Sequence, residues 1–103
     1  MHLISLKALS EASQRFPQHS QELLMLARII EKGNFPTPES LRKIYPTLDN
    51  FKYLDKHYII NIARNELRVI ALIFFESQKF YVRDIMTHAD YIKFTEAHRG
   101  KKR

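Results

Sequence analysis

The sequence predicts an α+β fold in which an N-terminal helical hairpin packs on an antiparallel β-meander that leads into a short C-terminal helix. Residues 57–63 and 67–75 are rich in β-branched and aromatic residues, and residues 80–86 alternate well enough for a third strand. Residues 6–32 carry apolar residues at helical spacing. Strands and helices are therefore segregated along the chain, as in an α+β protein.

The N-terminal part is expected to supply one strand and two helices. Residues 1–5 are β-prone and are predicted to add a strand to the sheet. A first helix over residues 6–16 has Ser5 as its expected N-cap. A second helix covers about residues 18–32, and Gly33 stands in the position of a C′ residue. The apolar stripe of this second helix comprises Leu23, Leu24, Met25, Leu26, Ala27 and Ile30. The two helices should cover the apolar face of the sheet.

Residues 34–56 are expected to be mostly irregular. Thr37 is a good N-cap and is followed by Pro38, a pattern that predicts a short helix. Residues 51–54 are predicted to form a short strand with a turn at residues 55–56. Thr87 with Asp90 three residues later resembles a capping box and predicts a final helix over about residues 88–97.

Two-residue turns at Arg64-Asn65 and Ser77-Gln78 would fix the register of the meander. This count pairs Asn61 with Arg68, Leu72 with Arg83, and Arg68 with Thr87. Because side chains alternate along a strand, one face of the sheet is polar and cationic. That face carries Asn61, Arg68, Tyr81 and Arg83. The opposite face is apolar and carries Ile60, Ile62, Leu67, Val69, Ile73, Phe80 and Val82. The asymmetry indicates that the cationic face is the functional one.

The composition is typical of a globular protein with a polyanionic partner. The chain has 103 residues, of which 45% are apolar, and a net charge of +6. Residues 1–98 are expected to form one domain, and residues 99–103 a frayed basic tail. The absence of cysteine excludes disulfides and Cys-ligated metals. No signal peptide or membrane-length apolar run is apparent, so we expect a cytoplasmic protein without membrane contact.

The available side chains suit one reaction well. The five histidines do not have the spacing of a zinc site, and neither a nucleotide-binding loop nor a serine-hydrolase motif is present, so no cofactor is expected. Metal-free RNA cleavage needs a base for the 2′-hydroxyl, cations for the charged phosphorane and an acid for the leaving oxygen. Arginine grips phosphate with two donors, tyrosine stacks or donates a proton, and histidine titrates near neutral pH. The candidate catalytic residues are Arg68, Arg83, His88 and Tyr91. The candidate RNA-binding residues are Lys52, Lys56, Asn61, Asn65, Tyr81 and Lys93.

Spaced motifs in the second half of the chain resemble the HigB toxins of type II toxin–antitoxin systems. These motifs are, in order, Asn61-Ile62, Asn65, Leu67-Arg68-Val69, Tyr81-Val82-Arg83 and Thr87-His88-Ala89-Asp90-Tyr91. The N-terminal MHLISLKAL and the stretches 38–41 and 48–51 fit as well, so the resemblance covers nearly the whole chain. It implies a RelE-like fold and cleavage of mRNA in the ribosomal A site. It further implies a HigA-like antitoxin with a helix-turn-helix, and operator DNA bound only through the toxin–antitoxin complex.

The resemblance also implies roles for individual residues. Arg68 is similar to the strand arginine that stabilises the transition state in RelE-like toxins, and Tyr91 lies in the region of their C-terminal tyrosine. His88 stands where many relatives carry lysine or arginine. The lysine pair that some relatives use as a base has no clear match, and Lys52 and Lys56 correspond only by rough location.

The residues leave two alternatives to an endonuclease open. One is a non-catalytic nucleic-acid-binding module that uses the same cationic face, and the other is a toxin homologue that only sequesters an antitoxin. For the single residues, the alternative interpretation is that a strand arginine is a surface ion-pair partner and that His88 merely follows a helix cap. Cleavage of message distinguishes both alternatives from the enzyme.

Overall fold

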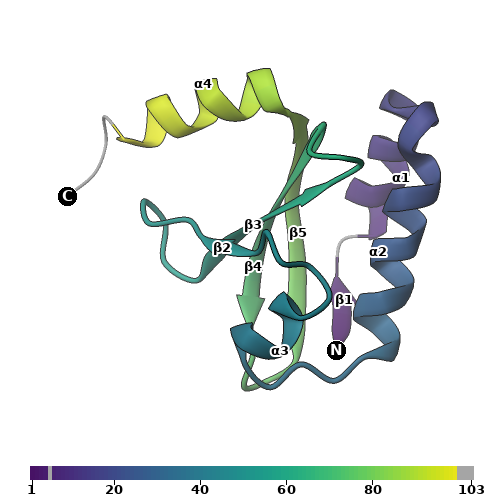
Figure 1. Cartoon of the computed structure of the whole chain (residues 1–103), viewed down its shortest axis with the longest axis vertical. Helices are drawn as coiled ribbons and strands as arrows, with labels where there is room; N and C mark the ends of the chain where they lie inside the picture. Colours follow the sequence, from purple (N-terminus) through teal and green to yellow (C-terminus); the bar gives the residue numbers. More distant parts are fainter. Residues whose placement is uncertain (5, 100–103) are drawn as a thin grey trace.

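A five-stranded sheet lies at the centre of the chain, in a computed structural model that describes residues 1–4 and 6–99 (Figure 1). The strands are β1 (His2–Ile4), β2 (Asp49–Asn50), β3 (His57–Ile62), β4 (Leu67–Phe74) and β5 (Lys79–Thr87), in the order β1-β5-β4-β3-β2. The helices are α1 (Leu6–Arg15), the 3-10 turn η1 (Pro17–His19), α2 (Ser20–Lys32), α3 (Pro38–Arg42) and α4 (His88–Arg99). The predicted α+β fold is confirmed.

Most predicted elements are present. The N-terminal strand is β1, which pairs in parallel with β5. Both N-terminal helices form, although the second begins with η1 before α2 starts at Ser20. Thr37 caps α3, since its hydroxyl accepts from the Ser40 N–H at 3.2 Å. The expected cap Ser5 and residues 100–103 of the expected tail lie outside the described residues, whereas Arg99 belongs to α4.

Three local predictions are wrong. Residues 51–54 do not form a strand: β2 is Asp49–Asn50, and the chain turns directly after it, with Leu54 N–H donating to the Phe51 carbonyl at 3.2 Å. Gly33 is the C-cap itself, with an extended backbone, and not a C′ residue. Glycine is required there because a Cβ atom would lie 2.4 Å from the Phe35 ring. Leu24 and Met25 do not widen the buried stripe of α2 but are exposed.

The first hairpin has the predicted register and the second does not. Asn61 pairs with Arg68, as expected. In the second hairpin, the Gln78 N–H donates to the Phe75 carbonyl at 3.3 Å, so the turn is centred on residues 76–77 and not on 77–78. The side-chain amide of Gln78 also bonds both the N–H and the carbonyl of Phe35, at 3.0 and 2.7 Å, and so anchors the turn. Tyr81, and not Arg83, therefore pairs with Leu72.

A β-bulge in β5 shifts the pairing of β5 with β4 by one residue, and this changes which side chains lie on each face. Ala71 pairs with Val82 while Ile70 pairs with Asp84, which leaves Arg83 as the extra residue. Beyond the bulge, Arg68 pairs with Met86 and not with Thr87. The predicted cationic face survives, because Tyr81 pairs with Leu72 before the bulge and Arg83 bonds His57 across the same face.

Each face of the sheet packs a separate apolar core. On the predicted apolar face, all seven expected sheet residues pack with Leu9 and Ala12 of α1 and with Leu23, Leu26 and Ile30 of α2. On the other face, a smaller core joins the sheet to α4 and comprises Phe51, Ile59, Ile70 and Met86, with Tyr53, Leu54, Tyr91 and Phe94 around it. In Figure 1, α4 accordingly crosses one end of the sheet, away from α1 and α2. None of the described helices has the length and apolarity needed to cross a membrane.

Phe51 is the centre of the smaller core. Its ring lies 5.3 Å from the Phe94 ring, 6.5 Å from the Tyr91 ring and 5.8 Å from the His98 ring, measured between centroids. No residue of α4 is itself buried, so the helix depends on this aromatic cluster for its attachment.

We predict that Phe51→Ala lowers the free energy of unfolding by about 3–5 kcal/mol, because it removes the aromatic ring that fills this core and leaves a cavity. In amide hydrogen exchange, the substitution should lower the protection factors of α4 more than those of α1 and α2. Phe51→Leu, which keeps an apolar side chain, is the matched control. A loss below about 1 kcal/mol for Phe51→Ala would contradict the role of Phe51 in holding α4.

Candidate active site

Arg68 brings three structural elements together at the end of the sheet where β4 begins. Its side chain is only 8% exposed. One terminal nitrogen, Nη1, donates to the Asn65 carbonyl in the turn before β4, and the other, Nη2, donates to Nδ1 of His88 at 2.8 Å. The guanidinium carbon lies 5.8 Å from the centroid of the Tyr91 ring. The structure therefore places Arg68, Asn65, His88 and Tyr91, all named from the sequence, in one cluster.

The turn that presents the Asn65 carbonyl has an unusual backbone. Ala63, Arg64 and Asn65 have φ angles of 54°, 56° and 69°, all in the left-handed region. Each such residue costs about 1–2 kcal/mol when it is not glycine. The turn is closed by a hydrogen bond of 3.1 Å from the Glu66 N–H to the Ala63 carbonyl. Backbone strain of this kind clusters at functional sites, where the surrounding contacts hold it in place.

His88 is a neutral imidazole in this arrangement. A guanidinium only donates hydrogen bonds, so Nδ1 of His88 must accept from Arg68 and the ring proton is on Nε2. His88 is the exposed first residue of α4, and Thr87 is the N-cap, since its hydroxyl accepts from the Asp90 N–H at 3.2 Å. The predicted helix start is thus confirmed. Its position fixes His88 beside Arg68.

Arg83 belongs to a second polar cluster on the same face. Its Nη1 donates to Nε2 of His57 at 3.1 Å, and Nδ1 of His57 donates to the Asp55 carbonyl at 2.7 Å. His57 is only 7% exposed, and these two bonds make it a neutral ring with its proton on Nδ1. His57 was missed from the sequence, where it was only one of five scattered histidines. The available signal was its spacing, since residues 57, 59 and 61 share a face of β3.

Tyr81 and Lys56 lie away from Arg68. Tyr81 packs edge-on against Phe74 at 5.9 Å and pairs with Leu72, four residues along β4 from Arg68, or about 13 Å at the rise of a strand. Lys56 stands before the opposite end of β3 and lines a cavity with residues of the second hairpin.

Asn61 lies beside the cluster, whereas Lys52 and Lys93 occupy other positions. Asn61 is directly opposite Arg68 in the pairing of β3 with β4, and its backbone N–H and carbonyl both bond the Thr47 hydroxyl, at 3.0 and 3.3 Å. The amine of Lys52 lies 5.3 Å from the Tyr53 ring, and Lys93 is exposed on α4. Within the described ranges, no group of three or more His, Asp or Glu side chains is arranged to hold a metal ion.

The arrangement can hold a phosphate and move a proton. Arg68 and Arg83 supply donors in the planar fork that matches phosphate oxygens. His88 supplies an imidazole next to one of these cations, and Tyr91 supplies an aromatic ring with a hydroxyl. These groups resemble the set required for attack of a 2′-hydroxyl on the neighbouring phosphate.

Comparison with known proteins identifies a family, and the matched range contains the residues of the Arg68 cluster. The family model of the HigB toxin, described as the RelE-like toxic component of a toxin–antitoxin system, matches residues 19–94. The mRNA interferase toxin HigB of Escherichia coli (strain K12) is 57% identical over 101 residues, which span 98% of this chain and 97% of the relative. The mRNA interferase HigB of Shigella flexneri has the same identity and coverage. The mRNA interferase HigB of Escherichia coli O6:H1 is 41% identical over 102 residues, or 99% of each chain. This chain therefore belongs to the HigB toxin family, the RelE-like toxic components of toxin–antitoxin systems.

Proposed function

We propose that this chain is an mRNA interferase, a metal-independent endoribonuclease that cuts message in the ribosomal A site and so inhibits translation in the cytoplasm. The similarity to relatives named mRNA interferase supports the substrate class. The observation that carries the proposal is the contact between the buried Arg68 guanidinium and His88, because it joins a phosphate-binding cation to a proton acceptor. The antitoxin is proposed to be HigA-like, with a helix-turn-helix that binds operator DNA on behalf of the complex.

In the proposed mechanism, RNA takes the place of the contacts that Arg68 makes in the free chain. Arg68 turns its donors from the Asn65 carbonyl and His88 to the oxygens of the scissile phosphate, and there stabilises the charge of the phosphorane. Nδ1 of His88 is then released to accept the proton of the attacking 2′-hydroxyl. A neutral imidazole is a poor acid, so the resting tautomer favours His88 as the base. The Tyr91 hydroxyl is the candidate that protonates the leaving 5′-oxygen.

The proposed dependence on the ribosome is based on the small number of catalytic groups in the site and on the hydrogen bonds that already engage Arg68. Arg68 is buried and engaged, so RNA must be held in the reactive geometry before Arg68 exchanges partners. The ribosomal A site supplies that orientation in this proposal, and Arg83, held by His57, is a second contact for the message backbone.

We predict that the chain cuts message on translating ribosomes far more efficiently than purified RNA, and that Arg68→Ala slows this cleavage by about 100- to 1,000-fold. Primer extension and single-turnover rates measure both effects. Because Arg68 is buried, thermal melting must show that the variant folds, and Arg68→Lys, which keeps a charge without the fork, should be intermediate. Arg28→Ala removes an exposed charge from α2 and is the matched control. Intact message with retained binding would instead identify a non-catalytic module.

We predict that His88→Gln lowers the single-turnover rate on programmed ribosomes by about 100- to 10,000-fold while RNA binding is kept, because the base is lost. The rate of this variant should depend less on pH than the wild-type rate does, since the base is lost. Thr87→Ala is the control for the helix start: it should cost about 1 kcal/mol of stability without slowing cleavage once folded. An unchanged rate and pH profile in His88→Arg would remove His88 from proton transfer.

We predict that His57→Phe weakens binding of the message as much as Arg83→Ala does, because the buried imidazole holds the Arg83 guanidinium. The double variant should bind no more weakly than either single variant, since both remove the same contact. Each variant is made in a chain that also carries Arg68→Ala, so that the message is not cut. The affinity of these chains for the message is then measured at several salt concentrations. Losses that add in the double variant would show that His57 and Arg83 contribute to binding independently, which would contradict the role of His57 in holding Arg83.

A further inference from the structure

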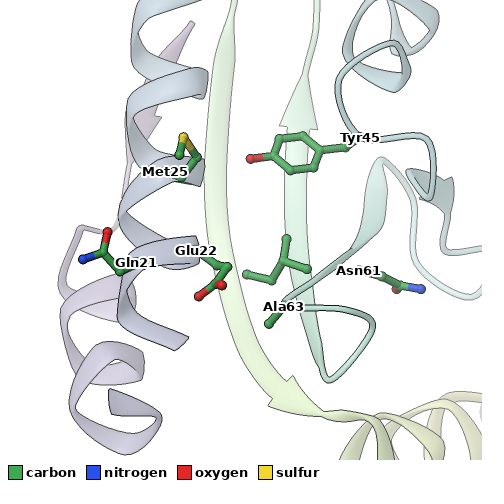
Figure 2. Close-up of a pocket in the computed structure, with 7 residues that line it drawn as sticks. Gln21, Glu22, Met25, Tyr45, Asn61 and Ala63 are labelled. Atoms are coloured by element: carbon green, nitrogen blue, oxygen red, sulfur yellow. The ribbon is translucent and has the colours of Figure 1, made fainter. Parts of the chain in front are cut away.

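Exposed apolar side chains of α2 face the segment after α3 across a groove. It consists of two hollows that follow each other along α2, one lined by Met25 and Tyr45 and the other by Ile29 and Ile44, and we call the two together the α2 groove. Met25 is 58% exposed and Ile44 is 46% exposed, although both are large apolar side chains. Figure 2 shows the Tyr45 ring pointing from its loop toward Met25. Clustered exposed apolar residues of this kind mark interaction surfaces.

One end of the α2 groove is a cavity suited to protein side chains. Gln21, Glu22 and Asn61 line it together with Met25, Tyr45, Ile62 and Ala63, and its volume is about 240 Å³. This volume is below the range of about 300–1,000 Å³ that is usual for small-molecule sites. Burial raises the pKa of Tyr45 to about 12, so its hydroxyl stays neutral and polar inside an apolar wall. The cavity is therefore shaped for apolar side chains of a protein partner rather than for a metabolite.

The other end of the groove is cationic. Arg28 and Lys32 border it beside Ile29, Phe35 and Ile44. Among the described residues, the salt bridges are His19 with Glu66 and Arg42 with Glu39, so neither Arg28 nor Lys32 is neutralised within the chain. A symmetric contact between two copies would bring these like charges to the same interface, which is unfavourable. The charges favour a partner with carboxylates at this position.

We propose that the α2 groove is the docking surface for the antitoxin. An amphipathic segment of the antitoxin inserts apolar side chains between Met25 and Tyr45 and places carboxylates against Arg28 and Lys32. Along α2, residues 21 to 33 span about 18 Å, which matches roughly three turns of a helix. This inference rests on the proposed function for its partner. It adds where the partner binds, on the side of the sheet opposite α4.

The groove also reaches the turn that holds Arg68. Ala63 lines the cavity beside Tyr45 and is the first of the left-handed residues in that turn. Asn65, two residues later, provides the carbonyl that accepts from Arg68. An occupant of the α2 groove thus touches the active-site turn from behind without covering His88 or Tyr91.

The test is calorimetric titration of the purified antitoxin of this toxin–antitoxin pair into the full-length chain, carrying Arg68→Ala so that cells tolerate it. Met25→Glu and Ile44→Glu should each weaken binding by about 30-fold or more, as for residues at the centre of an interface. Arg28→Glu combined with Lys32→Glu should weaken it as well and reduce its salt dependence. Leu24→Glu, on the same helix at 51% exposure but outside the groove, and Ile92→Glu, on α4 at 46%, are the matched controls and should bind normally.

Three results would overturn the docking surface. These are normal binding by Met25→Glu and Ile44→Glu, loss of binding in Ile92→Glu alone, or a dimer of the free chain that Met25→Glu dissociates in sedimentation. With Arg68 restored, Met25→Glu should cut message at the wild-type rate yet escape neutralisation. A wild-type chain that cuts no message would reject the proposed function and leave the calorimetric result valid, so the two failures are distinguishable.

Discussion

The packing of Phe51 beneath α4 is the contact on which the candidate active site depends. Arg68 lies at the start of β4, and its partners His88 and Tyr91 come from a helix with no buried residue of its own. The aromatic cluster around Phe51 packs this helix against the sheet. The site is therefore assembled by a small apolar core that is separate from the main core under α1 and α2.

Both arginines of the site are held by neutral acceptors. Arg68 donates to the Asn65 carbonyl and to a neutral His88, and Arg83 donates to a neutral His57. Among residues 1–4 and 6–99, no carboxylate forms a salt bridge with either of them. A carboxylate partner would cancel the positive charge that a phosphate must meet, whereas carbonyl and imidazole groups position the cation and leave its charge available. The buried charge of Arg68 costs desolvation, and binding of a polyanion recovers part of that cost.

The two proposals assign catalysis to one face of the sheet and antitoxin binding to the other. The face under α4 presents the arginines, while the α2 groove lies on the helical side and is apolar with a cationic border. The turn of residues 63–66 belongs to both, since Ala63 lines the groove and Asn65 binds Arg68.

Most helices and strands, the register of the first hairpin and the family could be predicted from the sequence. Alternation and helical spacing are local properties, so the meander, the helical hairpin and the pairing of Asn61 with Arg68 could be predicted from neighbouring residues. The register of the second hairpin, the bulge at Arg83 and the hydrogen-bond partners of both arginines depend on tertiary contacts and could not be predicted. The Gln78 amide is fixed by Phe35, 43 residues away, and Arg83 by His57, 26 residues away. Such contacts join side chains that are distant in sequence, and no local pattern encodes them.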